Sequence, residues 1–354
     1  MQLLSETIEK IGPADKTYYE KALTRLSEQA RPAGSLGRLE AAAARLSAIK
    51  QTLDVRLENK VIVTCAGDHG IVEEGVSLFP QDVTPQMVYN FIDGGASINV
   101  LGRHAGARVR VADFGVNHDF DPALPMFHKK IRKGTRNFLK EPAMSREEAV
   151  RAIEAGIEVV AELWREQPVD MIATGDMGIG NTSPSTAIIA AYSEIPVARL
   201  TGRGTGLDDK GLIHKTQVIE AALKKHQPNP DDPLDVLGKV GGYEIAGIAG
   251  IVLGGAASGI PVVSDGLIST AGTLIAAELA PAARDYLFTA HQSVECGHQY
   301  MLERLGIQPL LNLDMRLGEG TGAALAMEIL DAATRVLAEI RTFAEVNIEN
   351  AHRR

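Results

Sequence analysis

Short apolar runs alternate with helix-forming stretches over most of this sequence. From Lys60 onward, each run ends in a cluster of glycines or acidic residues and is followed by a stretch with helical periodicity. The runs are 61-VIVTCAGDHG, 109-VRVADFGVN, 171-MIATGDMGIGN, 198-ARLTGRGTG, 261-PVVSDG, 286-YLFTAHQS and 310-LLNLDMRLGEG. A parallel connection needs a crossover of about a dozen or more residues, which a helix supplies. The pattern therefore predicts an α/β fold with a doubly wound, mostly parallel sheet covered by helices on both faces.

The two ends of the sequence show helical periodicity without strands. We expect helices over residues 17–29 and 39–49, joined by the link RPAGSLGRLE, and a long Ala-rich helix from Gly322 to about Ala344. These helices are expected to pack together as a small helical domain built from both chain ends. The predicted division is a helical segment over residues 1–55, an α/β substrate-binding domain over 56–320 and a C-terminal helix over 321–354.

One stretch without charged residues has the length of a membrane span. Residues 245–264 are 20 residues bounded by Glu244 and Asp265. The stretch contains five glycines and Pro261, which break a continuous helix. We therefore predict a buried helix, a Gly-Ile-Pro turn and a short strand, and no contact with a membrane.

The composition narrows the possible functions. The formal net charge is −9, and nucleic-acid binding needs clustered Lys and Arg, so no nucleic-acid partner is expected. Cys65 and Cys296 form no C-x-x-C pair, which disfavours a disulfide framework or zinc ribbon and fits a reducing compartment. The stretch MQLLSETIEKIG lacks a basic leader and an apolar block, so we expect no export signal and predict a cytoplasmic protein.

A single acidic residue, Glu319, stands between Gly318 and Gly320 at the end of the last apolar run. Ligands bind beyond the carboxyl ends of the strands in doubly wound folds, so we expect Glu319 on the ligand side. Burial raises the pKa of such a carboxylate, which favours a role as general base. If Glu319 were only a charge at a helix N-terminus, the protein could be a non-catalytic nucleotide-binding module.

Two glycine-rich stretches are candidates for phosphate binding. Gly202 and Gly204 belong to a G-x-G-x-G stretch, which differs from the dinucleotide fingerprint G-x-G-x-x-G, and no G-x-x-x-x-G-K-[ST] motif occurs. A backbone nest here, with Lys215 on the next helix, can hold one phosphate; a plain turn with a solvated lysine is the alternative.

The second stretch is 175-GDMGIGNTS-183. Gly178 and Gly180 let the backbone approach a ligand, while Asn181 and Thr182 can cap a helix or offer donors to an anion. Simple capping does not explain why Asp176 also lies between glycines.

Metal binding has weaker support. His291, Glu295 and His298 fall at i, i+4 and i+7, which predicts one face of a helix, and Glu349 and His352 give a second Glu-x-x-His pair. A di-iron bundle needs further inward carboxylates on four facing helices, so we expect no metal site.

Several long motifs in the same order resemble one family. They are PAGSLGRLE at 32–40, AGDHGIVEEGVSLFPQDVT at 66–84, GDMGIGNTSPS at 175–185, KVGGYEIAG at 239–247 and MRLGEGTGAALAM at 315–327. Together they resemble the nicotinate-nucleotide:dimethylbenzimidazole phosphoribosyltransferases, which make α-ribazole phosphate for the lower ligand of cobalamin. The resemblance covers nearly the whole chain.

The resemblance implies a homodimer of Rossmann-like α/β subunits with a small helical domain, acting without a metal or cofactor on nicotinate mononucleotide and an aromatic base. It implies that Glu319 is the catalytic base and that the reaction inverts C1′. The residues it implies for the base are Phe79, Met87 and Gly320. The residues it implies for the nucleotide are Asp176, Gly178, Gly180, Asn181, Thr182, Gly202, Gly204, Lys215 and Ser293.

Other functions stay open from the residues themselves. The same chemistry on adenine, another benzimidazole or a phenol is an alternative, because Phe79 and Met87 occupy positions at which the residue type differs among family members. A nicotinamide dinucleotide oxidoreductase is a second alternative, which the missing fingerprint disfavours.

Overall fold

The structure, a computed structural model, describes residues 2–348 of the chain and has a six-stranded sheet at its centre. The strands are β1 (Lys60–Gly67), β2 (Ala107–Gly115), β3 (Phe127–His128), β4 (Met171–Met177), β5 (Val262–Ser264) and β6 (Leu287–Thr289). Their order is β3-β2-β1-β4-β5-β6, and every neighbouring pair is parallel. The order reverses between β1 and β4, which is the switch point beside which doubly wound folds bind ligands. The predicted fold class is confirmed.

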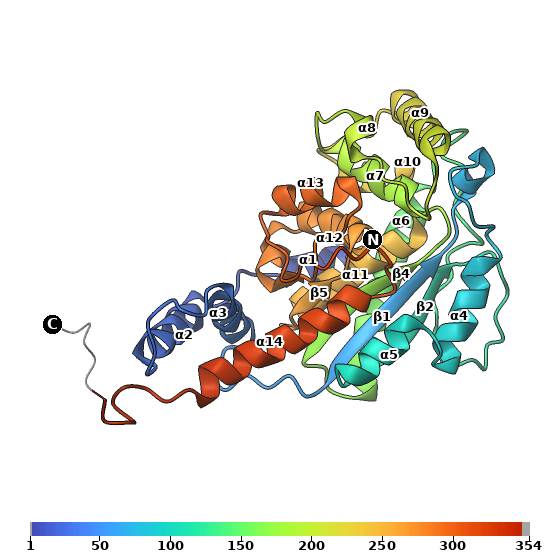
Figure 1. Ribbon diagram of the computed structural model, residues 1–354. Coiled ribbons are helices and arrows are strands. Elements are labelled where there is room, and N and C mark those ends of the chain that lie inside the picture. The colour runs from blue at the N-terminus through green and yellow to red at the C-terminus, as the bar shows by residue number, and fades with distance from the viewer. Residues whose placement is uncertain (1, 349–354) are drawn as a thin grey trace.

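Helices cover both faces of the sheet (Figure 1). On one face lie α6 (Arg146–Glu166), α11 (Tyr243–Ala257) and α12 (Leu267–Leu279), and on the other lie α4 (Val83–Asp93), α5 (Ser97–His104) and α14 (Thr321–Glu339). Successive side chains of β1 point to opposite faces of the sheet and pack against the helices on each face. Val61, Val63 and Cys65 belong to the cluster with α6 and α11, and Ile62 and Ala66 belong to the cluster with α5 and α14.

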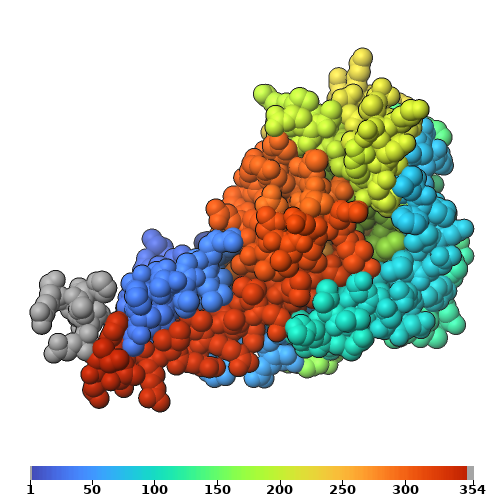
Figure 2. All heavy atoms as spheres, in the orientation of Figure 1, coloured from blue at the N-terminus to red at the C-terminus, as the bar shows by residue number. Residues whose placement is uncertain are grey.

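Helices from both chain ends lie side by side away from the sheet (Figures 1 and 2). They are α2 (Lys16–Glu28), α3 (Arg38–Lys50) and the far end of α14, and they share one apolar cluster. The side chain of Gln29 donates to the Val336 carbonyl at 2.6 Å, which ties the link after α2 to α14. Helix α1 (Gln2–Glu9) packs elsewhere, because Leu4 joins the cluster around α6 and α11. The division into domains at residues 55 and 320 stays a prediction.

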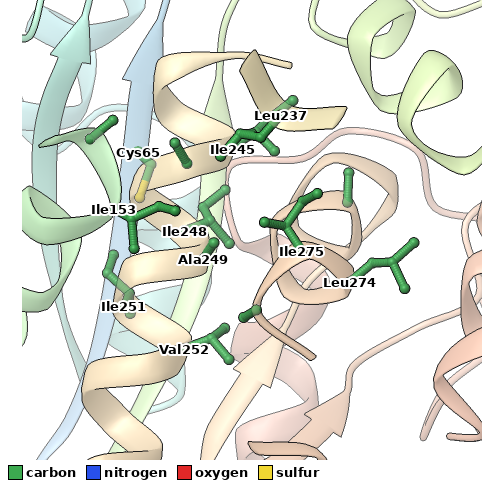
Figure 3. Packing of buried hydrophobic residues seen from close by; sticks show 14 of the residues in the cluster. Cys65, Ile153, Leu237, Ile245, Ile248, Ala249, Ile251, Val252, Leu274 and Ile275 are labelled. Carbon is green, nitrogen blue, oxygen red and sulfur yellow. The ribbon is translucent and has the colours of Figure 1, made fainter. Parts of the chain in front are cut away.

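The charge-free stretch forms the buried helix, turn and short strand that its glycines indicated. Figure 3 shows Ile245, Ile248 and Val252 of α11 in the core. Glycines let α11 lie directly against α6, because a Cβ on Gly250 would fall 1.9 Å from the Ile153 carbonyl oxygen. Within residues 2–348, no helix combines the length and the apolar character needed to cross a membrane.

The remaining helices connect the strands. They are η1 (Gly70–Glu74), α7 (Thr182–Ala191), α8 (Val197–Leu200), α9 (Asp209–His226), α10 (Pro233–Val240), η2 (Pro281–Tyr286) and α13 (Cys296–Leu305).

Two predicted strands are wrong. The run at 198 forms the short helix α8 followed by a loop, and the run at 310 forms only an isolated bridge between Leu311 and His291. Leu200 of the first run is buried, whereas Leu310 and Leu311 of the second are only partly buried and Leu313 is exposed. Periodicity cannot tell a short helix or loop with apolar side chains from a strand. The strand β3 was not predicted, because its sequence contains no apolar run. The last helix ends at Glu339, not near Ala344.

Candidate active site

A cavity of about 340 Å³ opens at the carboxyl ends of β4, β5 and β6. In the space-filling view the molecule is hollowed where segments from the first, middle and last thirds of the chain meet (Figure 2). The predicted site residues that line the cavity are Phe79, Met87, Asp176, Gly178, Asn181, Thr182, Gly204, Ser293 and Glu319. The predicted residues Gly180, Gly202, Lys215 and Gly320 lie outside this lining. Tertiary structure thus brings together side chains that are far apart in the sequence.

Glu319 sits on a turn of unusual backbone geometry. Gly318, Glu319 and Gly320 all have positive φ angles, of 88°, 63° and 99°. A glutamate adopts this region only when its surroundings hold it there. The Glu319 N–H donates to the Asp176 carbonyl at 3.1 Å, and its carbonyl accepts from Thr64 Oγ1 at 2.9 Å. These contacts to β4 and β1 fix the turn at the sheet edge.

The Glu319 carboxylate is buried and faces the N-terminus of α5. Its Oε2 accepts a hydrogen bond from the Ile98 N–H at 3.0 Å, and the residue is only 5% exposed. Burial raises the pKa of this carboxyl, the Ile98 hydrogen bond opposes that rise, and the negative charge of Asp265 adds to it. A carboxylate with a raised pKa in a cavity wall is suited to accept a proton from a ligand.

Asp265 holds the turn that carries Glu319 and was not identified from the sequence. Its two carboxylate oxygens accept from the Gly320 N–H at 3.1 Å and the Ala323 N–H at 2.9 Å, which caps the start of α14. His291 Nε2 lies 3.7 Å from Asp265 Oδ1, and its ring lines the cavity. Burial raises the pKa of Asp265, while His291 and the backbone donors lower it.

Asp176 lies next to this turn at the end of β4. Its Oδ2 accepts from Asn181 Nδ2 at 3.0 Å, and its Oδ1 is buried without a hydrogen-bond partner among the described residues. Asn181 therefore binds Asp176 and does not cap α7 with its side chain. Burial raises the pKa of Asp176 well above the usual value, and the neighbouring charge of Asp265 raises it further.

We expect Asp176→Asn to stabilise the fold at neutral and alkaline pH. A carboxyl whose pKa is higher in the folded state than in the unfolded state binds its proton more tightly when folded, so stability falls as pH rises between the two values. Asparagine does not titrate, and its amide oxygen can still accept from Asn181. Urea unfolding should show a gain on the order of 1 kcal/mol at pH 8 that shrinks toward pH 4. The exposed Asp54→Asn is the control, and equal stability of Asp176→Asn and the parent protein at both pH values would contradict the expectation.

Lys215 lies behind the cavity lining, in contact with Thr182. It is fully buried, and its Nζ donates to Thr182 Oγ1 at 2.7 Å and to the Gly202 carbonyl at 3.3 Å. It makes no ion pair with any carboxylate in the described part of the chain, and burial lowers its pKa to about 8. A buried ammonium without a directly paired carboxylate, beside a glycine turn, is suited to bind an anion.

Ser293 lines the cavity in a network set by His298. The Ser293 N–H donates to His298 Nδ1 at 2.9 Å, so His298 Nε2 carries the proton and donates to Thr270 Oγ1 at 2.9 Å. Burial lowers the pKa of His298 to about 3. His298 is therefore a neutral structural residue.

The prediction that His291, Glu295 and His298 share one helix face is wrong. Helix α13 begins at Cys296, so His291 lies in the loop after β6 and Glu295 is the residue before the helix. Residues 2–348 contain no group of three or more His, Cys, Asp or Glu side chains placed to hold a metal ion. Glu349 and His352 lie outside the described residues.

Apolar side chains also line the cavity. They are Phe79, Val83, Met87, Ile268 and Leu317. Phe79 is half exposed, and a lining of this kind is suited to contact a flat aromatic ring.

Sequence reasoning missed several side chains that line the site or hold it in place. They are Asp265, His291, Glu295 and Arg316. Asp265 follows the β5 run and Arg316 lies within the MRLGEGTGA motif, so strand-end position was the signal that could have found them. His291 and Glu295 were considered only as metal ligands.

Comparison with known proteins gives concordant results. A family model described as phosphoribosyltransferase matches residues 11–348. The chain is 57% identical to the nicotinate-nucleotide–dimethylbenzimidazole phosphoribosyltransferase of Citrifermentans bemidjiense over 351 residues, which is 99% of this chain and 100% of that protein. The protein of the same name from Geobacter sulfurreducens is 56% identical over 98% of this chain and 99% of its own length. A crystal structure of CobT from Thermus thermophilus is similar with a TM-score of 0.91 and 43% identity, covering 95% of this chain and 100% of that one.

Proposed function

We propose that this chain, which belongs to the nicotinate-nucleotide–dimethylbenzimidazole phosphoribosyltransferase family, transfers a phosphoribosyl group. The donor is nicotinate mononucleotide and the acceptor is 5,6-dimethylbenzimidazole. The products are nicotinate and α-ribazole 5′-phosphate. The observation that carries the proposal is the buried Glu319 carboxylate, held on a constrained turn in the wall of a cavity that is also lined by apolar side chains and by Thr182 and Gly204.

The proposed chemistry requires one base and no general acid. Nicotinate leaves C1′ from a pyridinium linkage that is already cationic, so its departure needs no proton. The incoming benzimidazole attacks C1′ through its bare ring nitrogen and becomes an imidazolium. Glu319 then accepts the proton from the other ring nitrogen, after stabilising the charge as it develops.

The shape of the cavity supports this arrangement. The apolar residues Phe79 and Met87 would hold the flat base, and Thr182 and Gly204 would hold the 5′-phosphate, with the Lys215 ammonium directly behind Thr182. Attack opposite the leaving group inverts C1′ from β to α, which requires both rings to be aligned on one ribose.

The direct test is to mix the purified protein with nicotinate mononucleotide and a panel of bases, and to measure free nicotinate and the ribosylated product. Dimethylbenzimidazole, another benzimidazole, adenine and a phenol separate the possible acceptors. The proposal is supported if nicotinate is released only with dimethylbenzimidazole, or faster with dimethylbenzimidazole than with the other bases. No release with any base would refute the transferase reaction.

We expect Lys215→Met to raise KM for nicotinate mononucleotide by on the order of 10-fold or more, because a charge-assisted hydrogen bond to phosphate contributes roughly 1.5–3 kcal/mol. Methionine fills the same buried volume without the charge. Initial rates at saturating base give KM, and the exposed Lys210→Met on the same helix is the control. An unchanged KM would place the phosphate elsewhere.

The proposal includes a cytoplasmic homodimer. Large apolar side chains gather at the cavity mouth, with Leu78, Phe79 and Leu317 each at least half exposed. Exposed apolar groups gathered in this way support self-association at that face. Light scattering at several concentrations measures the mass of the particle, and a stable monomer would contradict this part of the proposal.

A further inference from the structure

A carboxylate occupies the anion end of the cavity. Glu295 precedes α13, and its Oε1 accepts a hydrogen bond from the Gly204 N–H at 3.0 Å. Its Oε2 is buried and has no hydrogen-bond partner among the described residues. The oxygen lies directly against Gly202, where an added Cβ would fall 1.8 Å from it. Only glycine at residue 202 leaves room for this carboxylate.

The N–H that Glu295 occupies belongs to the group of donors assigned to phosphate. Gly204 has a φ angle of 52°, in the left-handed region that turns successive N–H groups toward one point. A Cβ on Gly204 would lie 3.0 Å from Thr182 Oγ1 and 3.4 Å from Lys215 Nζ, so these donors surround the same small volume. Glu295 therefore sits among the groups that would bind the 5′-phosphate of the substrate.

A carboxylate and a phosphate cannot both accept from this N–H. Two anions at hydrogen-bond distance repel each other. Among the described residues, Lys215 is the buried cation beside them, and the exposed Arg316 donates to the Gly204 carbonyl at 3.4 Å. In the absence of phosphate, the Glu295 charge also stabilises the Lys215 ammonium, which otherwise has no counter-ion among the described residues.

We propose that Glu295 is an internal anion that occupies the Gly204 N–H in the free enzyme, is displaced by the 5′-phosphate, and thereby sets the affinity for the phosphorylated substrate. The inference rests on the proposed function, since it concerns the phosphate of the same nucleotide. Part of the binding free energy of the phosphate is used to displace Glu295. Glu295 thus limits the affinity while it keeps the empty site ordered.

Calorimetric titration of Glu295→Gln with nicotinate mononucleotide and with the riboside that lacks the phosphate tests this. Loss of the Glu295 charge lowers the pKa of Lys215 further, below its value of about 8 in the unaltered protein, so the titrations are run near pH 6 to keep the Lys215 ammonium protonated in both proteins. The Kd for the mononucleotide is expected to fall at least about fivefold, and the Kd for the riboside to change less than twofold. Inorganic phosphate should follow the mononucleotide. Glu303→Gln on the exposed side of α13 removes the same charge outside the site and should change neither constant.

Other results would overturn the inference. An unchanged Kd for the mononucleotide means that Glu295 does not compete with phosphate. A similar loss of affinity for both ligands means that Glu295 binds the ribose. If the variant does not fold, a crystal of the unaltered protein with inorganic phosphate decides: a phosphate oxygen on the Gly204 N–H with Glu295 turned away supports the inference, and a Glu295 carboxylate still on that N–H overturns it. Absence of nicotinate release by the unaltered protein would instead refute the proposed function.

Discussion

Replacing Glu319 with glutamine is expected to lower turnover by on the order of 10²-fold or more while the protein stays folded. Glutamine has the same shape, and its side-chain oxygen can still accept from the Ile98 N–H that holds the carboxylate. What it cannot do is take a proton from the imidazolium that forms when the benzimidazole attacks. The measurement is the initial rate of nicotinate release at saturating concentrations of both substrates.

The pH dependence gives a second readout for the same residue. Glu319 acts as a base only when ionised, and burial raises its pKa above the ordinary value for glutamate. Turnover of the unaltered protein should therefore fall as the pH decreases through this raised pKa, and Glu319→Gln should lack that limb. Glu328→Gln, farther along α14 and partly exposed beside Lys60, is the matched control and should keep normal turnover. Near-normal turnover in Glu319→Gln would remove the residue from its proposed role.

Adding one methyl group at Gly175 is expected to lower turnover by on the order of 10²-fold, although Gly175 does not line the cavity. A Cβ at this position in β4 would lie 2.2 Å from the Glu319 carbonyl oxygen and 2.5 Å from the Gly320 nitrogen. Both are backbone atoms and cannot rotate away, so the turn that carries Glu319 must move. A displacement of about 1 Å is enough to misalign a catalytic group by this amount.

Gly175→Ala should also lower the free energy of unfolding by about 1–3 kcal/mol, as overpacking of a close contact does. Gly238→Ala is the control, because a Cβ on that buried glycine of α10 meets only the Met144 carbonyl oxygen at 3.5 Å, an ordinary contact. Steady-state rates and urea unfolding of both variants give the comparison. If Gly175→Ala turned over as fast as Gly238→Ala, the turn would not depend on its close contact with β4.

The sequence predicted those secondary-structure elements whose pattern lies within one short stretch of residues. The alternation of apolar runs and helices predicted β1, β2, β4, β5 and β6, and the glycines of residues 245–264 correctly indicated a helix, a turn and a strand. It failed for the runs at 198 and 310, because a short apolar run does not by itself specify the backbone conformation. The His-Glu-His spacing failed for a related reason: periodicity has meaning only inside a helix, and the helix starts at Cys296.

By itself, the sequence determined the doubly wound sheet and the family, because these depend on periodicity and on motifs that are continuous in the chain. The residues that the family resemblance implies for base and nucleotide stay predictions. Only the tertiary structure showed that Asp265 holds the Glu319 turn through Gly320, 55 positions along the chain, that Gly175 must lack a side chain for that turn to fit, and that Glu295 reaches the Gly204 N–H. The physical reason is that hydrogen bonds and close contacts depend on distances in space. Those distances are fixed by the packing of the whole fold, which no stretch of sequence contains.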